Sequence, residues 1–169
     1  AQAKTLRHLT SLNFHLRGNG SLPKSHMELP QNYKVSASAR AQGNVELSAE
    51  NLQTLESAPP KEFGGPGNIW SPEDFLVAAV ADCFVLSFRA IAAASKFEWT
   101  ALTCSATGKL DKVERAIQFT EINVNATLAV PAGADEARAL KLLEKAEQAC
   151  FITNSLKAPA HLDAKIVVG

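Results

Sequence analysis

The chain has 169 residues, of which 46% are hydrophobic and 20% are charged, an ordinary composition for one globular domain. Lys and Arg together number 17 and Asp and Glu together number 17, so the formal net charge is zero. This balance argues against a general nucleic-acid binder and against a protein of anionic membrane surfaces, because both need a basic surplus. Three cysteines are too few for a disulfide-rich secreted scaffold and favour a reducing, cytoplasmic setting.

Residues 1–26 differ in composition from the rest of the chain. They contain four Lys and Arg residues and three of the four histidines, but no Asp or Glu. Glycine and proline over residues 18–23 interrupt any long element, and the only methionine follows as Met27. We predict that 1–26 is a poorly ordered leader or tag-like extension and that 27–169 is a single domain. Three origins of the leader stay open: an expression-derived extension with Met27 as the natural start, an arm that packs on a partner subunit, and an organelle transit peptide.

Short strands are predicted before the middle of the chain, because apolar and polar residues alternate there with a period of two. Residues 33–40 and 45–49 alternate on either side of a turn at 41–44, which predicts a hairpin. A third short strand is expected over about residues 51–57. Residues 58–68 contain two prolines in succession and three glycines, so they are expected to form a loop.

A long apolar helix is predicted to begin after this loop. Ser71-Pro72-Glu73-Asp74 offers a capping hydroxyl, a proline at the first helical position and acids at the positive end of the helix dipole. The helix is expected to reach about Lys96, and 17 of the 20 residues from Phe75 to Ala94 are apolar. Its length would suit a membrane span, but its two full charges and seven alanines argue against one. We expect a central helix enclosed by sheet and by another subunit.

Two long antiparallel strands are predicted over residues 102–110 and 116–130, joined near 111–115. Their alternation places Phe119 on the face opposite to that of Ile122. A last strand is expected over 161–168.

A second helix is predicted over residues 135–149, between these strands and the last one. Its apolar stripe is expected to consist of Leu140, Leu143, Ala146 and Cys150. The resulting order of three strands, helix, two strands, helix and strand is typical of an α+β protein.

Cys83 and Cys150 are the informative candidates for chemistry, although a buried cysteine taken alone is usually a small hydrophobic residue. Cys104 lies on a predicted strand, and nothing in its neighbourhood distinguishes it. A zinc site is not expected, because no Cys-x-x-Cys pair occurs and His161 is the one histidine beyond the leader.

A reactive thiol needs a positive partner that favours the thiolate. Arg89 lies about 120° from Cys83 around the predicted helix, so it should not face that thiol. The spacing of the chain leaves both Arg40 and Arg115 open as the partner.

Two segments resemble the OsmC/Ohr family of thiol peroxidases. The first runs from Glu62 to Gly67 and resumes from Ser71 to Phe84, and the second runs from Ala149 to Lys157. The second holds a Cys-x-x-[Ser/Thr]-Asn pattern at Cys150, 67 residues after Cys83. The resemblance extends over about residues 32–168 and is looser in the first hairpin.

The resemblance implies an α+β fold in an intertwined homodimer, with antiparallel sheets around long central helices. It implies reduction of organic hydroperoxides and of hydrogen peroxide. Cys83 aligns with the family's peroxidatic cysteine, Cys150 with its resolving cysteine, Glu62 with its active-site glutamate and Arg40 with its active-site arginine.

The mechanism implied by the resemblance begins with a sulfenic acid on Cys83, which condenses with Cys150 to a disulfide. Arg40 would stabilise the thiolate, and Glu62 would hold Arg40 in a bidentate pair. A dithiol reductant of lipoyl or similar type would reset the disulfide. The implied partners are thus a peroxide, a dithiol and a second copy of the chain, with no metal or organic cofactor, no nucleic acid and no membrane.

Alternatives stay open within the same fold. A dimeric small-molecule-binding protein would bury its cysteines without using them, and a redox sensor would oxidise once without turnover. Phe84, Phe88 and Ile69, near Cys83 in the sequence, are expected either to line a pocket for alkyl peroxides or to belong to the core.

Overall fold

The structure is a computed structural model that describes residues 28–169. The predicted leader lies outside the described residues. Residues 28–34 belong to a unit separate from the rest and contain no helix or strand. Residues 35–169 form the second unit, to which all the described helices and strands belong.

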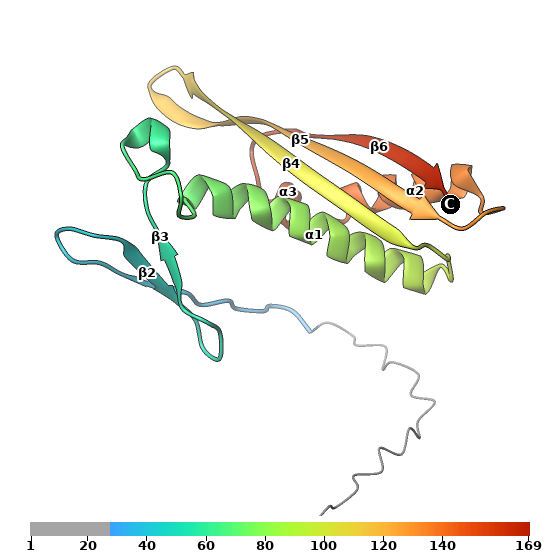
Figure 1. Cartoon of the computed structure of the whole chain (residues 1–169), viewed down its shortest axis with the longest axis horizontal. Helices are drawn as coiled ribbons and strands as arrows, with labels where there is room; N and C mark the ends of the chain where they lie inside the picture. The colour runs from blue at the N-terminus through green and yellow to red at the C-terminus, as the bar shows by residue number, and fades with distance from the viewer. Residues whose placement is uncertain (1–27) are drawn as a thin grey trace, which may run out of the picture. The chain divides into compact units, whose positions relative to one another are not determined.

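The order of elements follows the sequence prediction, with two short helices added (Figure 1). The elements are β1 (Ser36–Ser38), β2 (Val45–Ser48), β3 (Leu55–Ser57), the 3-10 helix η1 (Lys61–Phe63), α1 (Pro72–Ala94), β4 (Ala101–Val113), β5 (Ala116–Val130), α2 (Glu136–Gln148), α3 (Phe151–Asn154) and β6 (Ala160–Val168). The α+β class is confirmed. Neither η1 nor α3 was predicted, because elements of three or four residues leave no periodic signal.

The strands form two separate three-stranded sheets. The first has the order β1-β2-β3 and is antiparallel throughout, whereas the second has the order β4-β5-β6. In the second sheet, β4 and β5 are antiparallel but β6 runs parallel to β5. This parallel pair departs from the expectation of antiparallel sheets. The pair is parallel because α2 and α3 connect β5 to β6. This crossover returns the chain to the end of the sheet at which β5 begins, so β6 runs in the same direction as β5.

The core lies between one face of the second sheet and helices α1 and α2. Alternate residues of β5 from Ile122 to Val130 are buried and contact this core. The predicted face of Phe119 was wrong. A register shift between Lys109 and Leu110 leaves Thr120 unpaired, and this bulge turns Phe119 to the helix side, where it packs against the core.

The predicted stripe on α2 was wrong at one position. Leu143, Ala146 and Cys150 are buried as expected, but Leu140 is 38% exposed. Ala139 and Leu142 take its place on the buried face. At 100° per residue, Leu140 lies about 100° from Ala139 around the helix, which places it beside the buried stripe rather than on it.

Helix α1 is covered on one side only. Its buried residues are Val80, Phe84, Phe88 and Ala92, which recur every four positions and form a single stripe. The helix is long and apolar enough to cross a bilayer by length and composition alone, a property that core helices share. Leu86, on the other side, is 48% exposed. The expected enclosure from most sides is therefore not supplied by residues 28–169 of one chain.

The start of α1 is fixed by a reciprocal capping box. Ser71 Oγ accepts a hydrogen bond from the Asp74 N–H at 3.1 Å, and Asp74 Oδ2 accepts from the Ser71 N–H at 2.9 Å and from its hydroxyl at 2.8 Å. The Ser71 backbone bond, followed by the hydroxyl bond, lowers the pKa of Asp74 below its ordinary value. The capping residue predicted from the sequence is confirmed.

Replacing this cap tests its contribution to stability. We expect Ser71→Ala to lower the free energy of unfolding by about 1 kcal/mol, because an alanine leaves the Asp74 N–H without a side-chain acceptor. Urea unfolding followed by circular dichroism measures the change. Ser95→Ala, at the other end of the same helix, is the matched control and should alter stability much less. Equal effects of the two substitutions would contradict this role of Ser71.

Candidate active site

Cys83 and Cys150 lie together although 67 positions separate them in the sequence. Cys83 lies in the middle of α1, and Cys150 is the residue that precedes α3. Their thiol groups are joined by a hydrogen bond. Both are free thiols, with Cys83 half-buried and Cys150 only 1% exposed.

The loop that carries Cys150 is held by the two residues of its sequence pattern. The Thr153 hydroxyl donates to the Cys150 carbonyl oxygen at 3.1 Å, and the Asn154 amide donates to the Gln148 carbonyl oxygen at 3.0 Å. The Asn154 bond ties α3 back to the end of α2, and the Thr153 bond closes the first turn of α3 on Cys150. They give the Cys-x-x-Thr-Asn pattern a structural reason, since both side chains hold the backbone on either side of Cys150.

The environment of Cys83 favours its thiolate. Burial acts to raise the pKa of Cys83, but four hydrogen bonds to its sulfur outweigh burial and lower that pKa below the ordinary value. The donors are the backbone N–H groups of Ile152 and Phe151, the Cys150 thiol and the Ser87 hydroxyl. The two backbone donors come from the first turn of α3, whose N–H groups have no partner within the helix.

Cys150 shows the opposite shift. Burial raises the pKa of Cys150, and the neighbouring Cys83 adds to the rise because Cys150 donates its proton to the Cys83 thiolate. The backbone N–H of Thr153 acts against this rise without cancelling it. The pair therefore consists of one thiol disposed to ionise and one disposed to stay protonated, which separates a nucleophile from a thiol held in reserve.

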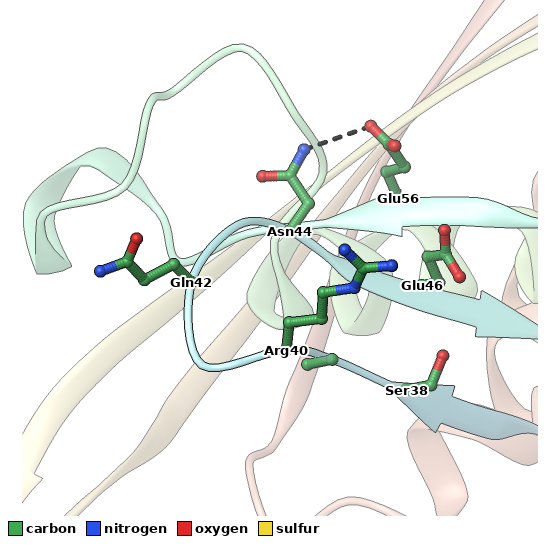
Figure 2. Close-up of a pocket in the computed structure, with 7 residues that line it drawn as sticks. Ser38, Arg40, Gln42, Asn44, Glu46 and Glu56 are labelled. Atoms are coloured by element: carbon green, nitrogen blue, oxygen red, sulfur yellow. Dashed lines mark hydrogen bonds between the residues drawn. The ribbon is translucent and has the colours of Figure 1, made fainter.

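Arg40 lies on the first sheet, apart from this pair. It follows β1 and lines a hollow of about 480 Å³ together with Glu46 and Glu56. Figure 2 shows its guanidinium directed toward Glu46, while Asn44 donates to Glu56 at 3.2 Å. Among the residues that the structure describes, no Lys, Arg or His contributes to the pKa shift of Cys83. One chain alone does not bring its Arg40 to the thiol pair.

Glu62 lies in η1, within the loop between the first sheet and α1. It is exposed and lines a second hollow, of about 520 Å³, between this loop, the first turns of α1 and the second sheet. Gly65 allows the loop to close on itself, because a Cβ at this position would overlap the Pro59 carbonyl. Glu62 and Arg40 line different hollows, so their predicted pairing is not formed within the chain.

Glu73 is a polar residue of this region that the sequence indicated only as an acid at the start of the helix. It lies in the first turn of α1 and lines the same hollow as Glu62. Its Oε2 atom is buried and has no hydrogen-bond partner in the described part of the chain. The sequence could not signal this, because an acid in the first turn of a helix is already explained by the helix dipole.

The aromatic candidates near Cys83 are core residues. Phe84 and Phe88 are 1% and 0% exposed, and Phe88 packs edge-on against Trp99 with ring centroids 5.3 Å apart. They therefore stabilise α1 on the sheet and do not line a peroxide pocket. Within residues 28–169, no cluster of three or more His, Cys, Asp or Glu side chains could hold a metal ion.

The chain is similar to known proteins over more than half of its length. Residues 65–165 match the family model described as OsmC-like protein. The chain is 30% identical over 96 residues to the peroxiredoxin OsmC of Escherichia coli, covering 57% of this chain and 66% of the relative. It is 27% identical over 136 residues to an organic hydroperoxide resistance protein of Xanthomonas axonopodis pv. citri, covering 78% of this chain and 93% of the relative. The matched stretch contains all three cysteines but begins after Arg40 and Glu62.

Solved structures agree with the fold. An OsmC-like protein of Vibrio cholerae superposes with a TM-score of 0.73 at 16% identity, over 82% of this chain and the whole of the other. An organic hydroperoxide resistance protein of Elizabethkingia anophelis gives a TM-score of 0.69 at 20% identity, over 85% of this chain and the whole of the other.

The hydrogen bond from Ser87 offers a test of the Cys83 environment. We expect Ser87→Ala to raise the pKa of Cys83, because the hydroxyl stabilises the thiolate and its loss favours the thiol. The rate of alkylation of Cys83 by iodoacetamide, followed by mass spectrometry as a function of pH, reports this pKa. Ser105→Ala, on the exposed face of β4, is the control and should leave the profile in place. An unchanged profile in Ser87→Ala would refute the assigned bond.

Proposed function

This chain belongs to the OsmC-like family, and from that membership we propose that it is a cysteine-based peroxidase that reduces organic hydroperoxides through Cys83 and Cys150. The observation that carries the proposal is the thiol pair itself. Its two members are hydrogen-bonded, and their pKa values are shifted in opposite directions. The relatives named for peroxiredoxin activity and for organic hydroperoxide resistance support the choice of substrate class.

The reaction begins with attack of the Cys83 thiolate on one oxygen of the peroxide. The O–O bond breaks, the alcohol leaves after taking up a proton, and Cys83 becomes a sulfenic acid. The Cys150 sulfur then attacks the Cys83 sulfur, water leaves, and a disulfide joins the two residues. An external dithiol, of lipoyl or similar type, reduces this disulfide and becomes oxidised itself. The cycle needs a reducing compartment, so we place the protein in the cytoplasm.

A second copy of the chain would complete the site. The thiolate needs a cation to hold the developing charge, and Arg40 has no carboxylate within ion-pair distance among the described residues. In this proposal Arg40 of the second copy reaches the Cys83 pair. The guanidinium of Arg40 can donate hydrogen bonds to more than one acceptor. The buried Oε2 atom of Glu73 lacks a donor among the described residues. Two residues, Glu62 and Glu73, are candidates to bind this arginine. Glu73 is favoured, because its Oε2 atom is buried without a hydrogen-bond partner in the described part of the chain.

Two uncovered surfaces support a homodimer. One side of α1 leaves apolar residues such as Leu86 exposed. The first sheet consists of three strands of three or four residues, with β1 exposed throughout and Leu55 46% exposed. A sheet this small is not stable without a covering layer. Because one chain carries both surfaces, two copies can cover each other with closed two-fold symmetry.

Substitution of the cysteines tests the activity. We expect Cys83→Ser to abolish consumption of cumene hydroperoxide in the presence of a dithiol, because the attacking sulfur is lost. Cys150→Ser should retain the first oxidation and then accumulate overoxidised Cys83. The measurement is peroxide consumption by stopped flow with mass spectrometry of the product.

Ser105→Ala, at an exposed position of β4, is the control and should keep its turnover. If Cys83→Ser consumed peroxide as fast as the parent, the peroxidase proposal would be wrong. A single oxidation without turnover under any dithiol would instead favour the redox-sensor alternative.

Mixed dimers test the role of Arg40 in the second copy. Arg40→Met and Cys83→Ser should each be nearly inactive alone. Co-refolded in equal amounts, they should recover up to about a quarter of the parental activity, because half of the dimers are mixed and each mixed dimer has one complete site. Arg115→Met mixed with Cys83→Ser is the control for the other arginine. No recovery in the Arg40 mixture would contradict the proposal that this arginine acts across the dimer.

A further inference from the structure

Helix α1 carries two full charges on the side that the rest of the described chain leaves open. Between Phe75 and Ala94 the charged residues are Asp82 and Arg89, and both are exposed. They are seven positions apart, so their directions differ by only about 20° around the helix and their positions by about 10 Å along it. Leu86, which is 48% exposed, lies between them on the same side. An acid, a large apolar residue and a base therefore follow one line along the exposed side of α1.

Contacts within the chain do not explain these two charges. Asp82 and Arg89 have no ion-pair partner within residues 28–169. The residues three and four positions from either of them are all Ala, Val or Leu, so the helix offers no opposite charge at the spacing that would bring one alongside. The elements against which α1 chiefly packs are α2, α3 and β4, and they leave both side chains exposed. A partner for the two charges must therefore come from outside the described part of the chain.

The exposed line of α1 is complementary to itself. Ala79, Asp82, Leu86, Arg89 and Ala93 lie within about 80° of one another around the helix, and we call them the self-complementary stripe. A two-fold axis that passes near Leu86, at right angles to α1, generates an antiparallel second copy. Asp82 of each copy then faces Arg89 of the other, the two Leu86 side chains meet, and each Ala79 faces an Ala93. A parallel second copy would instead set Asp82 against Asp82.

We propose that two copies of the chain pair through the self-complementary stripe, with the two α1 helices antiparallel and reciprocal Asp82–Arg89 ion pairs on either side of Leu86. This inference rests on the homodimer of the proposed function, to which it gives a contact face, but not on the peroxidase chemistry. The occupant is a second copy, because the pattern of charge and size complements itself about its own centre. The small side chains of Ala79 and Ala93 let the two helices approach closely at both ends of the contact.

The proposed contact keeps the reacting sulfur accessible. Cys83 lies about 100° from Asp82 around the helix, so it is at the margin of the stripe and not beneath the second helix. The second copy is thereby brought beside each Cys83, where the proposed reaction requires a residue of that copy. Interfacial ion pairs set the orientation and the choice of partner more than the affinity. Leu86 and the alanines therefore supply most of the contact, and the two charges set its register.

Charge reversal tests the pairing on the full-length chain in its reduced form. We expect Asp82→Arg and Arg89→Asp each to raise the dimer dissociation constant about tenfold or more, because each replaces two attractions by two repulsions. The double variant Asp82→Arg/Arg89→Asp should return it to within about threefold of the parental value, since every charge again faces its opposite. Sedimentation velocity over a dilution series measures the constant. The controls Glu144→Arg and Lys141→Asp make comparable changes on the exposed face of α2 and should leave it unchanged.

A mixture of the two single variants gives the decisive result. Asp82→Arg has only bases on the stripe and Arg89→Asp only acids, so the mixture should form heterodimers in preference to either homodimer. Native mass spectrometry separates the three species, because the two variants differ in mass. The pairing is overturned if both single variants dimerise like the parent or if the mixture shows no preference for the heterodimer. A parent that stays monomeric refutes both the pairing and the homodimer. The expected pattern in a protein that fails to consume peroxide would support the pairing and refute only the peroxidase function.

Discussion

The site depends on hydrogen bonds that converge on one sulfur atom. Ile152 and Phe151 direct their backbone N–H groups at Cys83, and Cys150 and Ser87 add a thiol and a hydroxyl. Burial alone would make Cys83 less acidic than an ordinary thiol. These donors reverse the shift, and the two backbone donors are available only because α3 begins beside the middle of α1. The crossover from β5 to β6, which contains α2 and α3, is therefore the part of the fold that the chemistry requires.

The sequence revealed the parts of the fold and site that depend on local patterns, and it did not reveal contacts between distant segments. The capping residues of α1, the order of the main elements and the two cysteines follow from local patterns and from the family resemblance. The contact between Cys83 and Cys150 was implied by the resemblance and could not be derived from spacing. The shift in Phe119 was not predictable, because a bulge at Thr120 has no signature in an alternating stretch of apolar and polar residues. The error at Leu140 has a similar origin, since an alanine at the centre of a buried stripe gives little signal.

The buried oxygen of Glu73 and the exposed first sheet point to the same need for a partner. An unpartnered carboxylate oxygen is costly inside a protein, and a small sheet with exposed apolar side chains lacks a covering layer. Neither is visible in the sequence, because acidity at a helix start and alternation in a hairpin each have a sufficient local explanation. Sequence patterns describe what one chain can satisfy within itself. What it leaves unsatisfied appears only in three dimensions.

The unequal burial of the two bridging cysteines has a consequence for outside thiols. The chain itself shields Cys150, which is 1% exposed, while Cys83 is only half-buried. A disulfide between them would present one sulfur to bulk solvent and the other to the protein interior. Electrons from a diffusing donor would therefore enter at the Cys83 end, and any covalent adduct left behind by an unfinished reduction would be attached to helix α1.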